Sequence, residues 1–430
     1  MNYEQTLEYL YAQLPMFSRV GAAAIKEGLG NTIALCNALG NPQNKIKTIH
    51  IAGTNGKGSV SHMLAAILQS AGYRTGLYTS PHLKDFRERI KSNGTPCSKE
   101  FITDFVEKTK PLSEKLSPSF FELTVAMAFS YFSINQVDIA VIETGLGGRL
   151  DSTNIITPEL SIITNIGKDH MNILGDTIEK IAFEKAGIIK QNIPVVIGEY
   201  IAETKPVFEK IASEKNAPIT YTQETRYITD WKYDHHLLKI TVAENANGNS
   251  KQYLLDLTGI YQAKNILTVL ESLHQLRLMG WEIADTAVIK GLQHVKKLTG
   301  LHGRWEIIHK NPAVILDVAH NEDGIRQIAE QLELIDYNHL HIVTGFVKDK
   351  DIHAALALLP KTATYYFTQA QIPRALPADE LAQMAEQKGL TGKIYDNVNL
   401  AMRTAIQHAH KNDLILVCGS VFLIGEVNEF

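Results

Sequence analysis

The amino-acid sequence predicts a two-domain α/β protein: a P-loop domain with a parallel sheet and a small antiparallel appendage, then a second α/β domain. Three observations predict this fold class. The chain has 430 residues, more than the roughly 250–300 residues at which a single hydrophobic core stops growing. Short apolar segments alternate with helical segments in two separate series, as they do in parallel α/β sheets. Residues 220–258 differ, because their short alternating segments predict antiparallel strands.

The first series is expected to form one sheet with helices on its faces. Its predicted strands are 47–52, 75–79, 138–143, 160–164 and 194–198. Helices are expected at 60–71 and 178–189. The run 138–143 is apolar almost throughout, which is typical of a parallel strand buried on both faces. The charged stretch 84–91 is expected to lie outside the core.

The second series starts after residue 300 and predicts a second parallel sheet. Its expected strands are 313–317, 341–344, 364–368 and 414–418. The expected helices between them are 324–334, 352–358 and 378–388. A basic, glycine-containing stretch at 296–301 separates the two series, so we place the domains at 1–297 and 298–430.

Composition points to a globular protein with small-molecule partners. Hydrophobic residues make up 45% and charged residues 20% of the chain, as in ordinary globular domains. A net charge of -4 gives no general attraction to nucleic acid or to an anionic membrane. The three cysteines lack metal-type spacing, which favours reduced thiols in a cytoplasm. We find neither a secretory signal nor an apolar run of the roughly 20 residues that span a membrane.

The loop Gly53-Thr54-Asn55-Gly56-Lys57-Gly58-Ser59 lies between a predicted strand and a predicted helix. Its small residues allow backbone N–H groups to converge on phosphate, while Lys57 supplies positive charge. The loop departs from the general P-loop pattern, because Ile51 occupies the position of the first glycine and Gly58 separates Lys57 from Ser59. The loop predicts nucleoside triphosphate binding; the alternative is a glycine turn that only reverses the chain.

Glu143 and His170 each lie at or just past the end of a predicted buried strand. Open α/β sheets bind ligands at the carboxyl ends of their strands. A carboxylate and an imidazole, together with a hydroxyl, suit a Mg²⁺ ion that also bridges ATP phosphates. In the alternative, Glu143 caps a glycine turn and His170 hydrogen-bonds a loop.

Arg304 and Asp317 are the corresponding candidates in the second series. The Arg304 guanidinium is suited to bind phosphate oxygens bidentately, and the Asp317 carboxylate is suited to accept hydrogen bonds from ribose hydroxyls. We therefore expect a nucleotide site between the domains. Arg304 as a surface ion-pair partner is the alternative. By the residues alone, Lys185 is ambiguous, because a lysine on an amphipathic helix is most often a solvated surface charge.

Motifs along nearly the whole chain resemble those of the Mur ligase family of ATP-dependent amide-forming enzymes, and of its folate branch in particular. After the glycine loop they are Thr79-Ser80-Pro81-His82-Leu83, Phe86-Arg87-Glu88-Arg89-Ile90, Glu143 to Asn154, Asp169-His170, Glu184-Lys185-Ala186-Gly187-Ile188, Gly303-Arg304, Asp317-Val318-Ala319-His320-Asn321 and Gly419-Ser420. His302 departs from the pattern, because the family usually has proline before this Gly-Arg pair.

The resemblance implies a Mur-ligase-like fold, with a P-loop domain that binds ATP and folate and a Rossmann-like C-terminal glutamate-ligase domain. It implies ATP- and Mg²⁺-dependent addition of L-glutamate to dihydropteroate and to tetrahydrofolates, through an acyl phosphate. The tetrahydrofolate activity alone is the alternative. The expected partners are dihydropteroate or a reduced folate and L-glutamate, without nucleic acid or membrane, and the expected protein is a cytoplasmic monomer.

The resemblance also implies roles for individual residues. The ATP site would comprise Thr54, Asn55, Gly56, Lys57, Gly58, Ser59, Asn265, Arg304 and Asp317. The Mg²⁺ ligands would be Ser80, Glu143 and His170. Lys185 is carbamylated in related ligases, which would make it an anionic ligand near the metal, and His320 is a candidate for binding the incoming glutamate. The folate and glutamate would contact Ser119, Phe121, Leu150, Asp151, Ser152, Arg87 and Ser420, with one of Phe120 and Phe121 left in the core.

Three other interpretations remain open at this point. A ligase of the same family that adds an amino acid to a peptidoglycan precursor is disfavoured by the folate-like string from Ser80 to Ile90. A P-loop switch or ATPase module would hydrolyse ATP without folate and glutamate. A kinase is disfavoured because it has no need of Asp317 and His320 in a second α/β domain.

Overall fold

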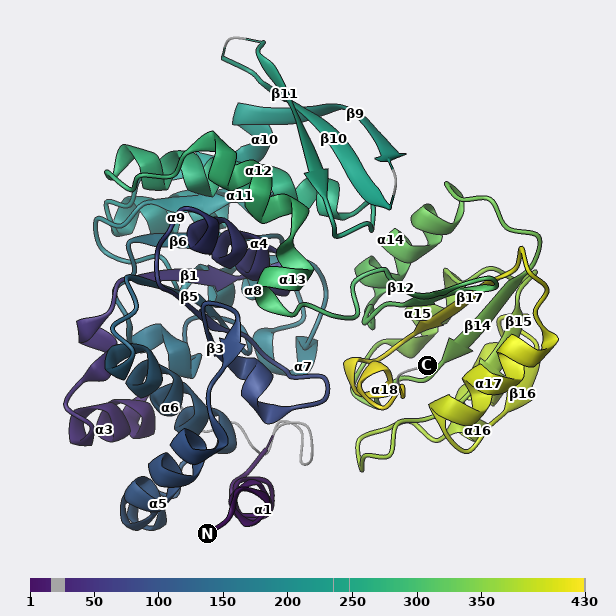
Figure 1. Cartoon of the computed structure of the whole chain (residues 1–430), viewed down its shortest axis with the longest axis horizontal. Coiled ribbons are helices and arrows are strands. Elements are labelled where there is room, and N and C mark those ends of the chain that lie inside the picture. The colour runs from purple at the N-terminus through teal and green to yellow at the C-terminus, as the bar shows by residue number, and fades with distance from the viewer. Residues whose placement is uncertain (17–27, 235, 247, 429–430) are drawn as a thin grey trace. The chain divides into compact units, whose positions relative to one another are not determined.

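The computed structural model describes residues 1–16, 28–234, 236–246 and 248–428 (Figure 1). The chain forms two compact units. Unit 1 comprises residues 1–167, 171–256 and 262–301, and unit 2 comprises 168–170, 257–261 and 302–430. Residues 168–170 and 257–261 therefore belong to unit 2, although unit 1 residues flank them in the sequence. The predicted division into residues 1–297 and 298–430 stays a prediction.

Unit 1 is built on an eight-stranded sheet of order β4-β3-β2-β5-β1-β6-β7-β8. Its strands are β1 Thr48–Ala52, β2 Thr75–Tyr78, β3 Ile90–Ser92, β4 Thr95–Pro96, β5 Ile139–Glu143, β6 Leu160–Ile163, β7 Val195–Ile197 and β8 Ile219–Tyr221. The six strands from β2 to β8 in this order are parallel, whereas β3 and β4 pair antiparallel at one edge. Every residue of β1, β5 and β6 is buried, which confirms the predicted central strands.

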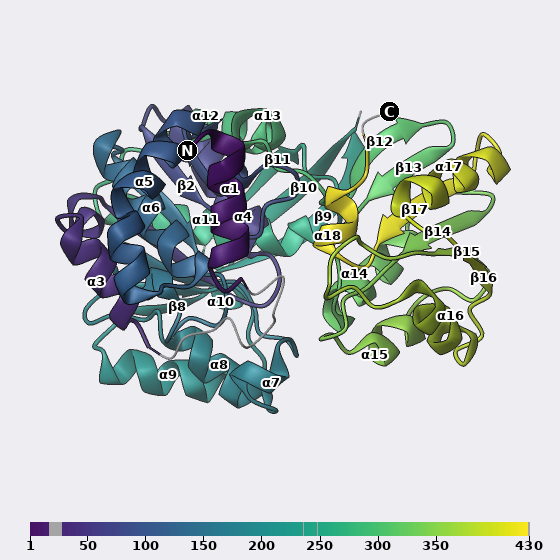
Figure 2. The same cartoon turned by 90° about the horizontal axis from the view of Figure 1, so that it is seen from below.

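Helices cover both faces of this sheet (Figure 1). They include α1 Tyr3–Gln13, α3 Gly30–Ala38, α4 Lys57–Ser70, α5 Lys99–Leu116, α6 Phe120–Ile134, α8 Ile178–Ala186, α9 Lys205–Glu214, α11 Gln262–Leu278, α12 Asp285–Gln293 and α13 Val295–Thr299. The view from below shows α5 and α6 beside α1 (Figure 2). One apolar cluster joins α6 to β2 and β5, and a second joins α8 and α9 to β6 and β7. Burial on both faces explains why the strand sequences are apolar without alternation.

The predicted antiparallel appendage is confirmed as a three-stranded sheet of order β11-β10-β9. Its strands are β9 Arg226–Asp234, β10 Leu237–Glu244 and β11 Ser250–Leu255. In the middle strand, Leu238, Ile240 and Val242 are buried on one face, which is the period-2 pattern of a sheet with one solvated side.

The expectation that the charged stretch 84–91 lies outside the core is wrong. Phe86 and Ile90 are fully buried, and Arg89 and Lys91 are exposed by only 7% and 4%. A short 3₁₀ helix, η3 (Phe86–Arg89), leads directly into β3, which pairs with β2. The Lys91 ammonium donates hydrogen bonds to the carbonyls of Thr299 (2.6 Å) and Gly300 (3.3 Å) at the end of α13, where a cation is favourable.

Unit 2 is built on a six-stranded sheet of order β12-β13-β17-β14-β15-β16. The strands are β12 Glu306–Lys310, β13 Ala313–Leu316, β14 Leu340–Thr344, β15 Thr364–Phe367, β16 Gly392–Ile394 and β17 Leu414–Cys418. Helices include α14 Glu322–Leu332, α15 Ile352–Ala357, α16 Ala378–Glu386, α17 Val398–His408 and α18 Val421–Gly425. All strand pairs are parallel except β12 with β13, so the predicted second α/β series is confirmed. Among the helices of the described residues, none is long and apolar enough to cross a membrane.

Candidate functional site

The glycine loop lies between β1 and α4, and the helix begins at Lys57, three residues before its predicted start. Gly53 and Gly56 have φ angles of 150° and 82°, where L side chains are disfavoured. A Cβ atom on Gly56 would also collide with the Asn265 side chain. The loop therefore needs glycine at this position, and it leads directly into the N-terminus of α4, the end of a helix that binds phosphate in other proteins.

The segment after β6 holds the loop in place. The backbone N–H groups of Thr54 and Asn55 donate to the carbonyl of Asn165 (3.0 Å) and to its side-chain Oδ1 (2.9 Å). The Thr54 hydroxyl accepts from Gly167 N–H at 2.9 Å. The Thr164 hydroxyl donates to the Asn55 carbonyl at 2.6 Å. These bonds fix the loop before any ligand is bound.

Two lysines converge on the carbonyl of Gly53. Lys57 Nζ donates to it at 3.0 Å and to the Thr54 carbonyl at 3.1 Å. Lys185 Nζ donates to the same Gly53 oxygen at 2.8 Å, and this residue is only 4% exposed. The interpretation of Lys185 as a solvated surface charge is therefore wrong. The Lys57 ammonium beside a loop of backbone N–H groups makes a positive site for phosphate.

Asn265, a predicted ATP residue on α11, lies against this loop. Its Nδ2 group donates to Gln262 Oε1 at 2.7 Å, and Gln262 Nε2 donates to the Ser59 hydroxyl at 3.1 Å. The first turn of α11 is thereby bonded to the first turn of α4. Sequence reasoning missed Gln262, because nothing in a single sequence distinguishes a buried glutamine from an exposed one.

Ser80 and Glu143, two of the predicted Mg²⁺ ligands, lie together in unit 1. The Ser80 backbone N–H donates to Glu143 Oε2 at 3.2 Å. Glu143 ends β5 and is only 4% exposed, and β5 lies between β2 and β1 in the sheet. A buried carboxylate whose neighbour in space is a serine offers the type of oxygen ligands that Mg²⁺ prefers, with the remaining positions left to water and phosphate. Among the described residues there is no group of three or more His, Cys, Asp or Glu side chains that could hold a metal ion.

His170, the third predicted ligand, packs with unit 2. Its Nε2 atom lies 3.2 Å from the Lys350 ammonium, which can only donate, so this nitrogen is the acceptor of a neutral ring. Burial and the charge of Lys350 lower the pKa of His170 to about 3. The role of His170 as a metal ligand stays a prediction.

Asp169 is the centre of this cluster. It forms an ion pair with Lys350 at 2.5 Å, lies 3.7 Å from His320 Nε2, and accepts from Asn321 Nδ2 at 3.3 Å. Burial by itself would raise the pKa of Asp169, but the nearby His320 and the charge of Lys350 outweigh it and hold the pKa well below its usual range. Sequence reasoning missed Lys350, whose only signal was a charged run directly after a predicted strand.

Asp317 is nearly fully buried in unit 2 and is already hydrogen-bonded there. Its carboxylate accepts from the Tyr261 hydroxyl at 2.7 Å, from Trp305 N–H at 2.8 Å and from Ala319 N–H at 2.9 Å. Burial raises the pKa of Asp317, although the three hydrogen-bond donors act to lower it. The predicted contact with ribose hydroxyls stays a prediction, because the carboxylate also has a structural role.

Arg304 follows Gly303, to whose carbonyl its Nη1 group donates at 3.2 Å. Within the described part of the chain its guanidinium forms no ion pair with a carboxylate, which disfavours the interpretation of Arg304 as a surface ion-pair partner. The guanidinium is half-buried. That Arg304 and the glycine loop bind one nucleotide stays a prediction.

The glycine loop after β5 is folded around Asp151. This carboxylate, only 5% exposed, accepts from the backbone N–H groups of Gly145 (2.9 Å), Leu146 (2.8 Å) and Thr153 (3.0 Å). Burial raises the pKa of Asp151. Leu150 beside it is 46% exposed. The loop is thus rigid at its base and presents an apolar side chain to solvent.

The two adjacent phenylalanines have different surroundings. Phe120 is 3% exposed and belongs to the apolar core of unit 1, which confirms that one of the pair is a core residue. The Phe121 ring packs directly against Gly145, where any Cβ atom would collide with it. Ser119 caps α6, because its hydroxyl accepts from Glu122 N–H at 3.2 Å.

The remaining predicted substrate residues also have local partners. Arg87 forms a bidentate ion pair with Asp85, with Nη2–Oδ2 at 2.7 Å and Nε–Oδ1 at 3.1 Å. The Ser420 hydroxyl accepts from Phe422 N–H at 3.1 Å and caps α18. Their contacts with substrate stay predictions.

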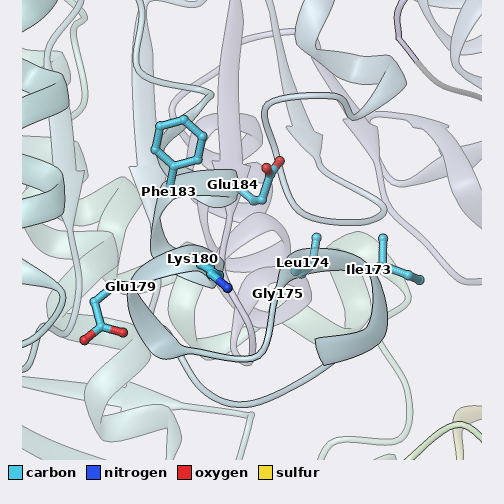
Figure 3. A pocket seen from close by; sticks show the side chains of 7 residues that line it. All are labelled: Ile173, Leu174, Gly175, Glu179, Lys180, Phe183 and Glu184. Carbon is cyan, nitrogen blue, oxygen red and sulfur yellow. The ribbon is translucent and has the colours of Figure 1, made fainter.

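A pocket of about 370 Å³ lies between α7 (Met171–Leu174) and α8 (Figure 3). It is lined by Ile173, Leu174, Gly175, Glu179, Lys180, Phe183 and Glu184. These lining residues include none of the predicted site residues. Leu174 also packs against Gly147 in the loop after β5, so the pocket lies next to this loop.

Comparison with known families gives two matches that follow each other along the chain. Residues 51–273 match the Mur ligase middle domain, and residues 303–421 match the Mur ligase glutamate ligase domain.

Individual proteins with similar sequences and structures agree. The dihydrofolate synthase/folylpolyglutamate synthase of Bacillus subtilis (strain 168) is 36% identical, over 94% of this chain and 95% of that protein. The structure of Escherichia coli FolC in complex with DHPP and ADP has a TM-score of 0.85 and 28% identity, over 99% of this chain and 96% of that one. A bifunctional folylpolyglutamate synthase/dihydrofolate synthase with Mn, AMPPNP and L-glutamate bound has a TM-score of 0.82 and 29% identity, over 99% and 97%.

Proposed function

The chain belongs to the Mur ligase family of ATP-dependent ligases, and from this we propose that it joins L-glutamate to dihydropteroate and to tetrahydrofolates. The observation that carries the proposal is the arrangement in unit 1. A preformed glycine loop with Lys57 and Lys185 on one carbonyl lies on β1, whose neighbour β5 ends in the buried Glu143 beside Ser80. Such an arrangement suits transfer of a phosphoryl group to a second substrate.

The reaction needs ATP because a carboxylate is a poor electrophile. A carboxylate oxygen of the acceptor attacks the γ-phosphorus of ATP, ADP leaves, and an acyl phosphate forms. The amine of glutamate, after losing a proton, then attacks the acyl carbon and expels phosphate, which leaves an amide. Lys57 and the N–H groups of the loop compensate the charge that develops on the phosphoryl oxygens.

Ser80 and Glu143 would hold Mg²⁺, with His170 as the proposed third ligand. When bound, the ion neutralises phosphate charge and orients the triphosphate. The backbone hydrogen bond from Ser80 to Glu143 orients the carboxylate, which supports Glu143 as a ligand. The relatives with bound ADP and with Mn and AMPPNP support ATP and a divalent cation as cofactors.

We assign the other roles by the same reasoning. Asn265, Arg304 and Asp317 would complete the nucleotide site, and His320 would bind the incoming glutamate. Leu150, Asp151, Ser152, Ser119 and Phe121 would hold the pterin, with Arg87 and Ser420 contributing to substrate binding. The Phe121 ring against Gly145 supports a flat heterocycle at this loop, since aromatic rings stack on such ligands.

Lys185 is proposed to carry a carbamate. Its buried position supports this, because burial favours the neutral amine that reacts with carbon dioxide. Intact-mass measurement of Lys185 peptides prepared gently under bicarbonate tests the proposal. An unmodified mass in bicarbonate would contradict it.

The cellular setting is part of the proposal. All three cysteines, Cys36, Cys97 and Cys418, are buried and free, which suits a reducing cytoplasm. We propose a monomer, which light scattering of the purified protein tests directly; a dimer mass would contradict it.

The activity itself is tested with purified full-length protein, Mg-ATP, L-glutamate and either dihydropteroate or tetrahydrofolate, with products identified by mass. Products from both acceptors are expected. Product from tetrahydrofolate alone would restrict the enzyme to polyglutamate extension. ATP turnover that is independent of acceptor and glutamate would instead indicate an ATPase module.

A further inference from the structure

Arg89 is a buried cation that the roles above leave unused. It ends η3, directly before β3, and is only 7% exposed. Arginine is rarely buried without an anionic partner, since removing its charge from water costs several kcal/mol. We therefore expect a negatively charged group to bind the Arg89 guanidinium.

The groups around the guanidinium are neutral. Arg89 Nε donates to His82 Nδ1 at 2.8 Å, the Phe120 ring centroid lies 5.2 Å from the guanidinium carbon, and the Tyr78 hydroxyl is adjacent. Because His82 Nδ1 accepts this hydrogen bond, it carries no proton and the ring is neutral. In the part of the chain that the structure describes, no carboxylate forms an ion pair with Arg89.

Arg87, two residues earlier, provides the contrast. It is partly exposed and is neutralised by a bidentate bond to Asp85. The more buried arginine of the pair is thus the one without a carboxylate partner. Burial lowers the pKa of the Arg89 guanidinium, whereas the charge of Glu143 raises it.

The position of Arg89 within unit 1 indicates which anion it would meet. Thr79 N–H donates to the Arg89 carbonyl at 3.2 Å, so Arg89 lies beside the residue before Ser80, at the edge of the sheet where Glu143 ends β5. On the other side, the rings of Tyr78 and Phe121 are 6.2 Å apart, and Phe121 packs on Gly145. The Phe121 and Tyr78 rings therefore lie between the proposed pterin loop and the Arg89 guanidinium.

We infer that Arg89 binds the carboxylate of the acceptor, the group that receives the phosphoryl group of ATP. This inference rests on the proposed function and deepens it. A guanidinium forms two parallel hydrogen bonds with a carboxylate, and the partly buried Phe121 ring suits the aromatic body of dihydropteroate. ATP has the glycine loop and Lys57 for its own charge and does not need this arginine.

The test compares two ligands on the full-length protein by fluorescence or calorimetric titration: dihydropteroate and its neutral carboxamide. Wild type should bind the acid about 10- to 100-fold more tightly than the amide, the range expected for one charge-assisted interaction. Arg89→Met should bind the two alike, with amide affinity and ADP affinity unchanged. Arg89→Lys, which keeps the charge but loses the fork, should retain part of the preference.

The control is Arg74→Met, which removes an exposed arginine from just before β2, at the opposite end of this strand. It should keep the full preference for the acid. If Arg89→Met still prefers the acid as wild type does, or loses affinity for acid and amide equally, the inference is overturned and Arg89 is structural. Should Arg89→Met not fold, an unchanged preference in Arg89→Lys overturns it equally. If wild type binds neither ligand, the proposed folate function fails and the inference falls with it, a result distinct from failure at Arg89 alone.

Discussion

The Tyr261 hydroxyl donates a 2.7 Å hydrogen bond to Oδ2 of Asp317, and the same oxygen accepts Trp305 N–H at 2.8 Å. Tyr261 ends the segment 257–261, which follows unit 1 residues, and Trp305 lies just after Leu301, where the chain again leaves unit 1. Within unit 2, the Asp317 carboxylate therefore bonds both segments that follow a crossing of the chain from unit 1, namely 257–261 and the segment that starts at His302.

Replacing Tyr261 with Phe should destabilise unit 2. The ring is retained, but the buried carboxylate loses one of its three donors, which costs about 1–3 kcal/mol. Denaturant unfolding followed by a probe in unit 2 measures this loss. Tyr227→Phe is the matched control, because Tyr227 is 47% exposed on β9. Equal unfolding midpoints for Tyr261→Phe and wild type would show that the hydrogen bond contributes nothing.

Gly56→Ala should weaken ATP binding by more than its backbone strain accounts for. The new Cβ would displace the Asn265 side chain from the loop. Gly72→Ala is an informative control, because Gly72 also has a positive φ, 96°, but open space around it. Both variants should lose about 1–2 kcal/mol of stability from the left-handed backbone, whereas only Gly56→Ala should lose nucleotide affinity, by about 10-fold or more. Titration with ADP decides; similar affinities in the two variants would contradict the role of Asn265.

Lys57→Ala should almost abolish product formation from both dihydropteroate and tetrahydrofolate, because both reactions would use one triphosphate site. The expected loss is on the order of 10²–10³ in kcat, the usual effect of removing one group that stabilises transition-state charge. Lys47→Ala removes a lysine whose side chain is 59% exposed and should leave both activities intact. Survival of either activity in Lys57→Ala would mean that the two reactions do not share this site.

Acid should destabilise the fold through His50, which lies on β1. Its Nε2 atom is 2.8 Å from the Thr153 hydroxyl, and burial lowers its pKa to about 3. The unfolded chain binds a proton at this site near pH 6.5, whereas the folded chain does not, so the stabilisation is present above pH 6.5 and is lost as pH falls toward 3. The slope from this one site is at most about 1.4 kcal/mol per pH unit.

His50→Gln keeps an N–H donor for Thr153 and cannot titrate. Urea unfolding at pH 7, 6, 5 and 4 should therefore show a weaker pH dependence in the variant than in wild type. The other fifteen of the 16 histidines are common to both proteins and cancel in the comparison. Parallel curves would show that His50 titrates normally in the folded protein.

Elements with a strong local pattern were predictable from sequence. The strand–glycine loop–helix from β1 to α4, the buried strand β5 and the antiparallel appendage follow from apolar runs, alternation and glycine positions. Elements with a weak pattern were not predicted. Strand β16, for example, is three exposed residues, Gly392–Ile394, and has no apolar run. Helix starts also shifted, because the loop glycines let α4 begin at Lys57.

The burial of charged residues was not predictable, since the compensating group is distant in sequence. Lys91 donates to Thr299, 208 residues away, and Asp169 pairs with Lys350, 181 residues away. Lys185 is a regular member of a helix pattern and becomes buried only because its ammonium reaches Gly53, 132 residues earlier. A single sequence records the charge but not the partner.

The assignment of residues 257–261 to unit 2 limits how the chain can be divided. A fragment cut at the bond between Leu301 and His302 would begin the carboxyl-terminal module without Thr258, Ile260 and Tyr261. It would lose their hydrogen bonds to Trp305, Gln331 and Asp317. Expressing residues 302–430 alone would therefore yield unit 2 without residues 257–261. Adding a peptide of these residues should restore the three hydrogen bonds.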